Sequence, residues 1–258
     1  MLFAREDFLG ADTAPFIPSW VNYLCIEGAI GAGKTSFCNL LARRCNARLV
    51  LEAAEENPFL EKFYRERRAF AFQTQIWFLA SRYRQLSGAV AQQDLFYRLT
   101  LSDYIFAKDR LFASVNLEED ELALYEQISS VMAGNIAPPD LVIYLQTSTD
   151  VLLKRIERRG RPYEFNMDPH YLDMLNEAYN HFFFHYTDTP LLIVNTDELD
   201  FVNNSADFEE LIDQIRHAGR GTTYFQPMAA GDKARLRERQ LFQAPSREVM
   251  DDTTIEEP

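Results

Sequence analysis

A glycine-rich stretch near the N-terminus has the residue types and spacing of a phosphate-binding loop. Residues 28–35, GAIGAGKT, fit the pattern G-x-x-x-x-G-K-[ST] without exception. Glycines let backbone N–H groups surround phosphate oxygens, Lys34 can reach the outer phosphates, and Thr35 can ligate magnesium. A chance glycine-rich turn is the alternative, but a predicted strand precedes the loop and a predicted helix follows it. We therefore predict that this loop binds a nucleotide together with Mg²⁺. Its binding residues are Gly28, Ala29, Ile30, Gly31, Ala32, Gly33, Lys34, Thr35 and Ser36.

Glu52 is a candidate general base. It falls where the second predicted strand should end, and in a parallel sheet the carboxyl edge is where ligands collect. A carboxylate there could accept the proton of an attacking hydroxyl during phosphoryl transfer to an alcohol. The alternative is a solvated loop acid, one of several together with Glu55 and Glu56. Spacing alone does not decide between the two.

Residues 72–86 have the apolar spacing of one helix. Gln75 and Arg82 lie seven residues apart, so they stand on one line at the flank of its apolar stripe. An amide and a guanidinium so placed can bind the polar edge of a planar base. The alternative is that both side chains lie on a polar helix face in water. The pattern of this helix, considered alone, favours that alternative.

Arginines cluster at the end of a helix that is predicted to begin near Ser148. They lie around a glycine, as Arg155, Arg158, Arg159, Gly160 and Arg161. Cations at a helix C-terminus have an ordinary stabilising role through the helix dipole. The density of arginines, together with the phosphate loop, favours a catalytic lid that stabilises charge on a transferring phosphoryl group and excludes water.

The elements that must position these residues alternate between strands and helices. Short apolar runs predict strands at residues 20–26, 48–51, 95–101, 141–145 and 191–194. Helical patterns separate them, beginning with a helix over residues 35–45. This alternation predicts an α/β fold of the P-loop NTPase type, with a five-stranded parallel sheet flanked by helices and an arginine-rich lid.

Length, composition and charge set further limits. The chain has 258 residues and is 47% hydrophobic, which suits one domain, placed at residues 19–218. Residues 1–18 are expected to form a flexible leader, and residues 219–258 a disordered tail. The formal net charge of −13 argues against a nucleic-acid-binding surface, which would need a basic face.

The cysteines and the lack of a long apolar run bear on the compartment. Cys25, Cys38 and Cys45 have no metal-ligand spacing, and no cationic, apolar leader accompanies them. No apolar run approaches the ~18 residues needed to cross a bilayer. We therefore expect a reducing, cytoplasmic location and no membrane association.

Together the motifs resemble the deoxynucleoside kinase family over roughly residues 20–218. The matching pieces, in order, are CIEGAIGAGKTS, LEAAEENPFLEKFY, FQTQIWFLASRYRQ, LSDYIFAKDRLFA and RIERRGRPYE. Many enzymes share the phosphate loop, but the glutamine helix followed by the R-I-x-x-R-G-R lid is quite specific. The resemblance implies transfer of the ATP γ-phosphoryl group to the 5′-hydroxyl of a deoxynucleoside in nucleotide salvage. It also suggests a homodimer.

The resemblance assigns roles to matching positions. Glu52 matches the family's general base, Gln75 the glutamine that pairs with the base, and Arg82 the arginine beside it. Tyr64 and Glu164 fall where the family contacts the sugar 3′-hydroxyl. The lid arginines around the ATP phosphates correspond to Arg155, Arg159 and Arg161. We expect Glu52, Lys34, Arg159 and Arg161 to be the catalytic residues.

One departure from the family lies after the third predicted strand. Most members have Glu-Arg-Ser there, whereas this chain has Ser102-Asp103-Tyr104, so the arginine is missing. This form resembles a bacterial branch associated with purine deoxynucleosides, in which Asp103 would bind magnesium through water or orient the sugar. Lys108 or Asp109 lies near the family's specificity-setting acid, so the base preference does not follow from the resemblance.

Two rival functions come from different classes. A nucleoside monophosphate kinase, such as a thymidylate kinase, shares the loop and lid but needs another cationic clamp, which Arg65, Arg67 and Arg68 could supply. A catalytically silent kinase-like subunit would be expected to lose Lys34, Thr35 or Glu52, and all three are present.

Overall fold

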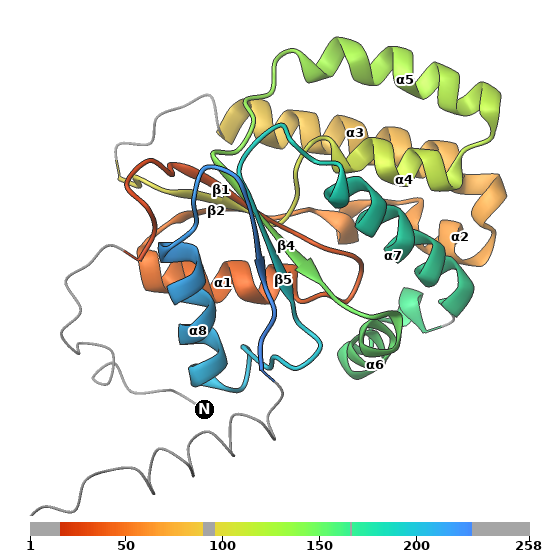
Figure 1. Ribbon diagram of the computed structural model, residues 1–258. Coiled ribbons are helices and arrows are strands. Elements are labelled where there is room, and N and C mark those ends of the chain that lie inside the picture. Colours follow the sequence, from red (N-terminus) through yellow and green to blue (C-terminus); the bar gives the residue numbers. More distant parts are fainter. Residues whose placement is uncertain (1–15, 90–95, 166, 229–258) are drawn as a thin grey trace, which may run out of the picture. The chain divides into compact units, whose positions relative to one another are not determined.

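The computed structural model describes residues 16–89, 96–165 and 167–228, and its centre is a parallel sheet (Figure 1). The strand order is β2-β3-β1-β4-β5-β6, and every neighbouring pair is parallel. The strands are β1 (Tyr23–Glu27), β2 (Arg48–Val50), β3 (Thr100–Ser102), β4 (Leu141–Gln146), β5 (Leu191–Asn195) and β6 (Thr222–Phe225). The predicted α/β class is confirmed, but the sheet has six strands and not the five that we expected.

The sixth strand lies in the segment that we predicted to be a tail. β6 pairs along β5 with Thr222 opposite Leu191 and Phe225 opposite Val194. Its residues alternate between exposed and half-buried, because β6 is at the edge of the sheet. It therefore lacks the continuous apolar run by which the buried strands were recognised, although threonine and aromatic residues favour strands.

Two further boundaries differ from the sequence-based expectation. The third strand was predicted at residues 95–101, whereas β3 covers Thr100–Ser102. Residues 90–95 lie outside the described part of the chain. Ile17, which we assigned to the leader, is buried in the main core with 8% of its surface exposed. The proposed boundaries at residues 18 and 218 otherwise stay predictions.

Helices cover both faces of the sheet, as Figure 1 shows. Helices α1 and α8 lie on one face, and α3, α4 and α7 lie on the other. The α-helices are α1 (Lys34–Cys45), α2 (Leu60–Arg65), α3 (Arg67–Ala89), α4 (Lys108–Asn116), α5 (Glu119–Ala133), α6 (Thr149–Arg159), α7 (Pro169–Phe184) and α8 (Ser205–Arg216). Two 3₁₀ turns, η1 (Ala54–Glu56) and η2 (Pro162–Glu164), lie beside the site described below.

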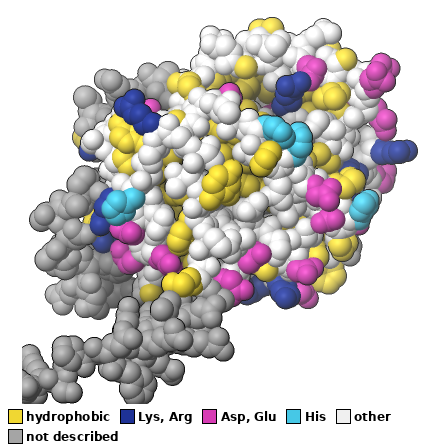
Figure 2. All heavy atoms as spheres, in the orientation of Figure 1, with side chains coloured by type: hydrophobic (Ala, Val, Ile, Leu, Met, Phe, Trp, Pro, Cys, Tyr) yellow, Lys and Arg dark blue, Asp and Glu magenta, His cyan; other side chains and the backbone are white. Residues whose placement is uncertain are grey.

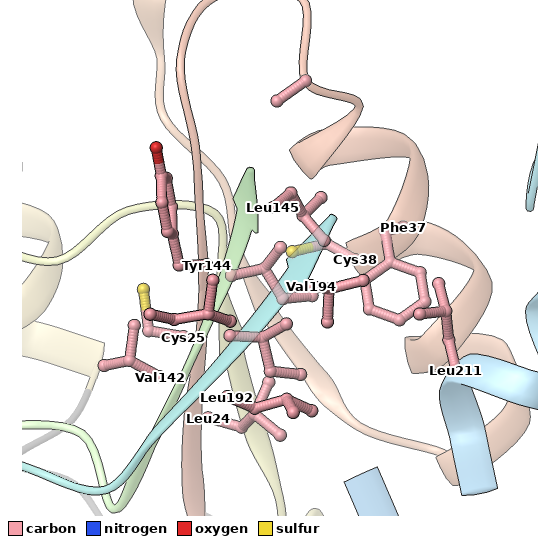
Figure 3. Close-up of a cluster of buried hydrophobic side chains, with 14 of the residues drawn as sticks. Leu24, Cys25, Phe37, Cys38, Val142, Tyr144, Leu145, Leu192, Val194 and Leu211 are labelled. Carbon is pink, nitrogen blue, oxygen red and sulfur yellow. The ribbon is translucent and has the colours of Figure 1, made fainter. Parts of the chain in front are cut away.

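The main core is formed where the central strands pack against α1 and α8. Figure 3 shows Leu145 and Val194, from β4 and β5, beside Phe37 and Cys38 of α1, with Leu211 of α8 next to Phe37. All five side chains are at most 1% exposed. Because these strands are buried on both faces, the sheet is a rigid base for the loops at its edge.

The surface visible in Figure 2 carries charges of both signs. On the face that Figure 2 shows, Lys and Arg side chains are scattered among Asp and Glu and do not gather into one patch. Of the helices in the described parts of the chain, none has the length and apolar character needed to cross a membrane.

Candidate functional site

The glycine loop joins β1 to α1 at the carboxyl edge of the sheet. Gly31 and Gly33 have φ angles of 91° and 95°, a region that side chains disfavour. A Cβ at Gly31 would lie 2.9 Å from Ile156, and one at Gly33 would lie 2.9 Å from Phe201. Gly33 is the N-cap of α1, and no side chain accepts a hydrogen bond from the first backbone N–H groups of the helix at this cap. These N–H groups can therefore bind an anion.

Lys34 begins α1 and folds back over the loop. Its Nζ donates hydrogen bonds to the carbonyl oxygens of Gly28 at 2.8 Å and Ala29 at 3.1 Å. Burial, together with the nearby charge of Lys108, lowers the pKa of Lys34 to about 8. Lys34 thus lies inside the loop, where an anionic phosphate could replace the carbonyl contacts and would favour its charged form.

Glu52 follows β2 and is held by cations from two helices. Its Oε1 accepts hydrogen bonds from Nε and Nη2 of Arg82 in α3, the former at 2.8 Å. Its Oε2 accepts one from Nζ of Lys108 in α4, at 3.3 Å. Burial alone would raise the pKa of Glu52, but the charges of Arg82 and Lys108 outweigh it and lower the pKa to about 2. The carboxylate is therefore ionised at neutral pH, which is the form that a general base must have before it takes a proton.

Asp103 connects the glycine loop to Glu52. Its Oδ2 accepts a 2.5 Å hydrogen bond from Oγ1 of Thr35, and its Oδ1 accepts a 2.8 Å bond from the backbone N–H of Glu52. A hydroxyl and a carboxylate so close together form the oxygen donor set that Mg²⁺ prefers. Within the described residues, no three or more His, Cys, Asp and Glu side chains are grouped to hold a metal.

The predicted acceptor-side residues line one cavity of about 420 Å³. It is bounded by the glycine loop, the end of β2, α3 and the lid. Its lining includes Lys34, Thr35, Glu52, Tyr64, Gln75, Arg82, Asp103, Arg159, Arg161 and Glu164. The structure thus brings Glu52 and the glycine loop to the walls of the same cavity, as the predicted reaction requires.

Several buried polar atoms in this cavity lack a hydrogen-bond partner. They are Oε1 of Gln75, Oγ1 of Thr74 and the hydroxyl of Tyr163. Gln75 and Thr74 are 2% and 1% exposed. Leaving such an atom unpaired costs about 1–3 kcal/mol, so a bound polar ligand would offset this cost. Tyr64 stacks on Tyr163 with ring centroids 5.8 Å apart, which forms a flat aromatic wall.

Arg82 is committed to protein contacts on both sides. Besides Glu52, its Nη1 donates to Oδ1 of Asp109, whose Oδ2 accepts a 2.7 Å bond from the hydroxyl of Tyr125. Asp109 is fully buried and does not line the cavity, whereas Lys108 does. Of the two residues that the sequence placed near the specificity position, only Lys108 therefore faces the ligand space. The lining residue Phe78 packs under the Arg82 guanidinium, 4.8 Å from the ring centroid.

The lid arginines fall into two groups. Gly160 is the C-cap that follows the last residue of α6, and its φ of 67° turns the chain back toward the site. Arg159 donates to both carboxylate oxygens of Glu164, and Arg161 forms an ion pair with Glu55 at 2.9 Å. Arg155 instead donates to the carbonyl oxygens of Thr196 at 2.7 Å and Leu199 at 3.1 Å, tying α6 to the loop after β5.

A second cavity, of about 530 Å³, lies on the other side of the glycine loop. It is lined by Gly31, Gly33, Ser36, the α6 arginines 155, 158 and 159, and residues 197 and 199–202. Gly31 and Arg159 line both cavities, so a phosphate chain held by the loop can reach the acceptor cavity. The sequence analysis missed residues 197–202. They follow β5, and the rule that ligands collect at the carboxyl edge of a parallel sheet could have identified them.

The contact of Lys108 with Glu52 was not predicted either. The segment directly after β3, Asp103-Tyr104, holds no arginine, and the cation that joins Arg82 at Glu52 comes from the start of α4. No local sequence signal places this lysine at Glu52, because the contact depends on how α4 packs.

Comparisons with known proteins agree with this geometry. The family model described as deoxynucleoside kinase matches residues 24–218. The deoxyguanosine kinase of Bacillus subtilis (strain 168) is 33% identical over 212 residues, which are 80% of this chain and 98% of that protein. The deoxyadenosine/deoxycytidine kinase of the same strain is 30% identical over 203 residues, covering 75% of this chain and 91% of that protein.

A solved structure shares the fold. The deoxyadenosine kinase from M. mycoides with bound dATP has a TM-score of 0.66 and 27% sequence identity. The match covers 75% of this chain and 98% of that one.

Proposed function

Because the chain belongs to the deoxynucleoside kinase family, whose members are phosphotransferases with an alcohol acceptor, we propose a specific reaction and specific residue roles. The enzyme transfers the γ-phosphoryl group of ATP to the 5′-hydroxyl of a deoxynucleoside, preferably a purine one, in nucleotide salvage. The purine preference is supported by relatives described as deoxyguanosine and deoxyadenosine kinases. The two rivals, a nucleoside monophosphate kinase and a silent subunit, are not favoured.

The observation that carries the proposal is the acceptor cavity. Its volume of about 420 Å³ falls in the range of small-molecule sites. Its lining includes Lys34, the ionised Glu52, and Gln75, whose amide oxygen has no hydrogen-bond partner. A nucleoside bound here would offer its base edge to Gln75 and its 5′-hydroxyl to Glu52.

The proposed chemistry follows from these positions. Glu52 accepts the proton of the 5′-hydroxyl while that oxygen attacks the γ-phosphorus and the bond to the departing ADP breaks. Tyr64 and Glu164 contact the sugar in this proposal, which their place in the lining of the same cavity supports, and Arg82 holds Glu52 through two hydrogen bonds. Arg159, which lines both cavities, and Arg161 stabilise the charge on the transferring group.

The donor side is assigned to the glycine loop and the second cavity. Backbone N–H groups of residues 28–36 and Lys34 hold the phosphates, with Arg155 and Arg159 alongside. Thr35 and Asp103 would hold Mg²⁺, which supplies charge neutralisation on the phosphates when bound. The second cavity has room for the adenosine end of the donor, against Phe201.

A substrate panel tests the proposal directly. Purified protein with ATP and Mg²⁺ is assayed by coupled turnover against the four deoxynucleosides and their monophosphates. We expect turnover with deoxynucleosides, highest with deoxyguanosine or deoxyadenosine. Folded protein that binds ATP but phosphorylates none of the deoxynucleosides would refute the reaction, and phosphorylation of monophosphates alone would restore the first rival.

We also propose that the protein is a cytoplasmic homodimer. Exposed apolar side chains on α5, Leu124 at 48% and Val131 at 77%, support a subunit contact on this helix. The three free cysteines support a reducing compartment. Light scattering at several protein concentrations measures the mass, and a monomer at every concentration would contradict the dimer.

A further inference from the structure

We infer that Lys108 is a positioning residue for the catalytic carboxylate, holding Oε2 of Glu52 so that the carboxylate faces the acceptor hydroxyl. The inference rests on the proposed function, because it concerns the group that takes the proton. The resemblance to related kinases places Lys108 only near the specificity position, and neither it nor the sequence motifs assign the lysine a role at Glu52.

Glu52 has a second cationic contact besides Arg82. Arg82 binds Oε1 through two of its nitrogens and leaves Oε2 without a contact from that side. Lys108 approaches from the start of α4 and places its Nζ 3.3 Å from Oε2. The carboxylate is thus held at both oxygens by cations from different helices, which restricts rotation about its last bond.

The burial of Lys108 shows that this contact is not a surface ion pair. Its side chain is 2% exposed, and it lines the acceptor cavity in contact with Glu52. A lysine without partners is costly to bury, so its place in the interior depends on the acids around it. Those acids are Glu52 after β2, Glu27 at the end of β1 and Asp103 after β3.

The surrounding charges explain why the cation comes from α4. The segment directly after β3 carries an acid, Asp103, which accepts the backbone N–H of Glu52 and the hydroxyl of Thr35. Lys34 is occupied with the carbonyl oxygens of the glycine loop. Lys108 is therefore the cation that remains for Oε2 among the described residues lining this cavity near Glu52.

Three variants separate positioning from a merely structural role. K108M removes the charge and keeps the length, K108Q keeps an N–H donor without the charge, and K108R keeps the charge. K62M is the matched control, because Lys62 is exposed on α2 and does not line the cavity. For each variant we would measure kcat and KM with the best deoxynucleoside, the Kd for ATP by calorimetry, and the melting temperature.

The expected result is a loss confined to turnover. K108M should lower kcat by about 10- to 100-fold, as small misplacements of a catalytic group do, while the ATP Kd changes less than about threefold. K108R should recover most of kcat, K108Q should fall between K108R and K108M, and K62M should match the wild type. If K108M does not fold, the order of kcat among wild type, K108R and K108Q carries the test.

Other outcomes overturn the inference. Folded K108M or K108Q with wild-type kcat would show that Glu52 needs no second cation. Equal losses of kcat and ATP affinity, with no recovery in K108R, would show that Lys108 only stabilises the fold. Wild-type protein inactive with every deoxynucleoside would refute the proposed function, and this inference with it, so the two failures are distinguishable.

Discussion

The hydroxyl of Thr35 lies 2.5 Å from Oδ2 of Asp103, so the first turn of α1 and the segment after β3 meet at a pair of oxygen ligands. The other oxygen of Asp103 accepts the backbone N–H of Glu52. One aspartate thereby links the proposed magnesium position to the proposed general base. Asp103 therefore fixes the start of α1 relative to the segment after β2 that carries Glu52.

The first prediction concerns magnesium. Asp103→Asn should raise the Mg²⁺ concentration for half-maximal activity at least about tenfold, because it removes the charge from a metal ligand. Activity titrations with MgCl₂ measure this concentration. The control is Asp213→Asn, a partly exposed acid of α8 outside both cavities. An unchanged magnesium requirement in D103N would remove Asp103 from the metal site.

The second prediction concerns Glu52. E52Q keeps the shape of the side chain but removes its ability to accept a proton, so kcat should fall about 100-fold or more. ATP binding, measured by calorimetry, should change little, because Glu52 lies on the acceptor side. The control is E61Q, because the side chain of Glu61 is exposed on α2 and does not line the cavity. Equal losses of kcat and ATP affinity in E52Q would point to a structural role.

The third prediction concerns Gln75. Q75L leaves a ligand's polar edge without its amide partner, so KM for the deoxynucleoside should rise by about 10- to 100-fold, equivalent to roughly 1–3 kcal/mol. The ATP Kd should be unaffected. Gln73 is exposed on the same helix, so Q73L offers the same chemical change outside the cavity. If Q73L and Q75L have the same KM, Gln75 does not contact the base.

The fourth prediction concerns the glycine loop. A Cβ at Gly33 would lie 2.9 Å from the Phe201 ring at a backbone φ of 95°. G33A should therefore cost about 1–3 kcal/mol of unfolding free energy and weaken ATP binding. At Gly88 in α3, an added methyl group would meet no atom of the described residues within 4 Å outside its own stretch of helix, so G88A should stabilise the fold by about 0.5–1 kcal/mol. Urea unfolding would show these opposite signs, and a stabilised G33A would contradict the proposed strain.

Local patterns in the sequence were sufficient for the parts of the site that lie within one element. The phosphate loop depends on consecutive residues between β1 and α1, and the structure has that strand, turn and helix. Gln75 and Arg82 both line the acceptor cavity, because seven residues make nearly two helical turns. The Arg-Gly-Arg turn was placed correctly, since the glycine at 160 ends α6 with a positive φ.

Local sequence patterns could not predict the contacts between segments that are distant along the chain. Thr35 and Asp103 are 68 residues apart, and Lys108 and Glu52 are 56 apart, so no periodic pattern relates them. Whether Lys108 or Asp109 faced the ligand depended on how α4 rotates as it packs on α3 and α7. The edge strand β6 was missed because pairing with β5 stabilises it, and its own apolar content is low.

The sequence by itself thus determined the fold class, the phosphate-loop turn and the alignment of Gln75 with Arg82 along one helix, because each is encoded in spacing along one element. The tertiary structure decided how the carboxylate of Glu52 is held, which second cation contacts it, and where the second cavity lies. Those features depend on side chains from separate helices and strands meeting at the carboxyl edge of the sheet, and only the packing of those elements determines that meeting.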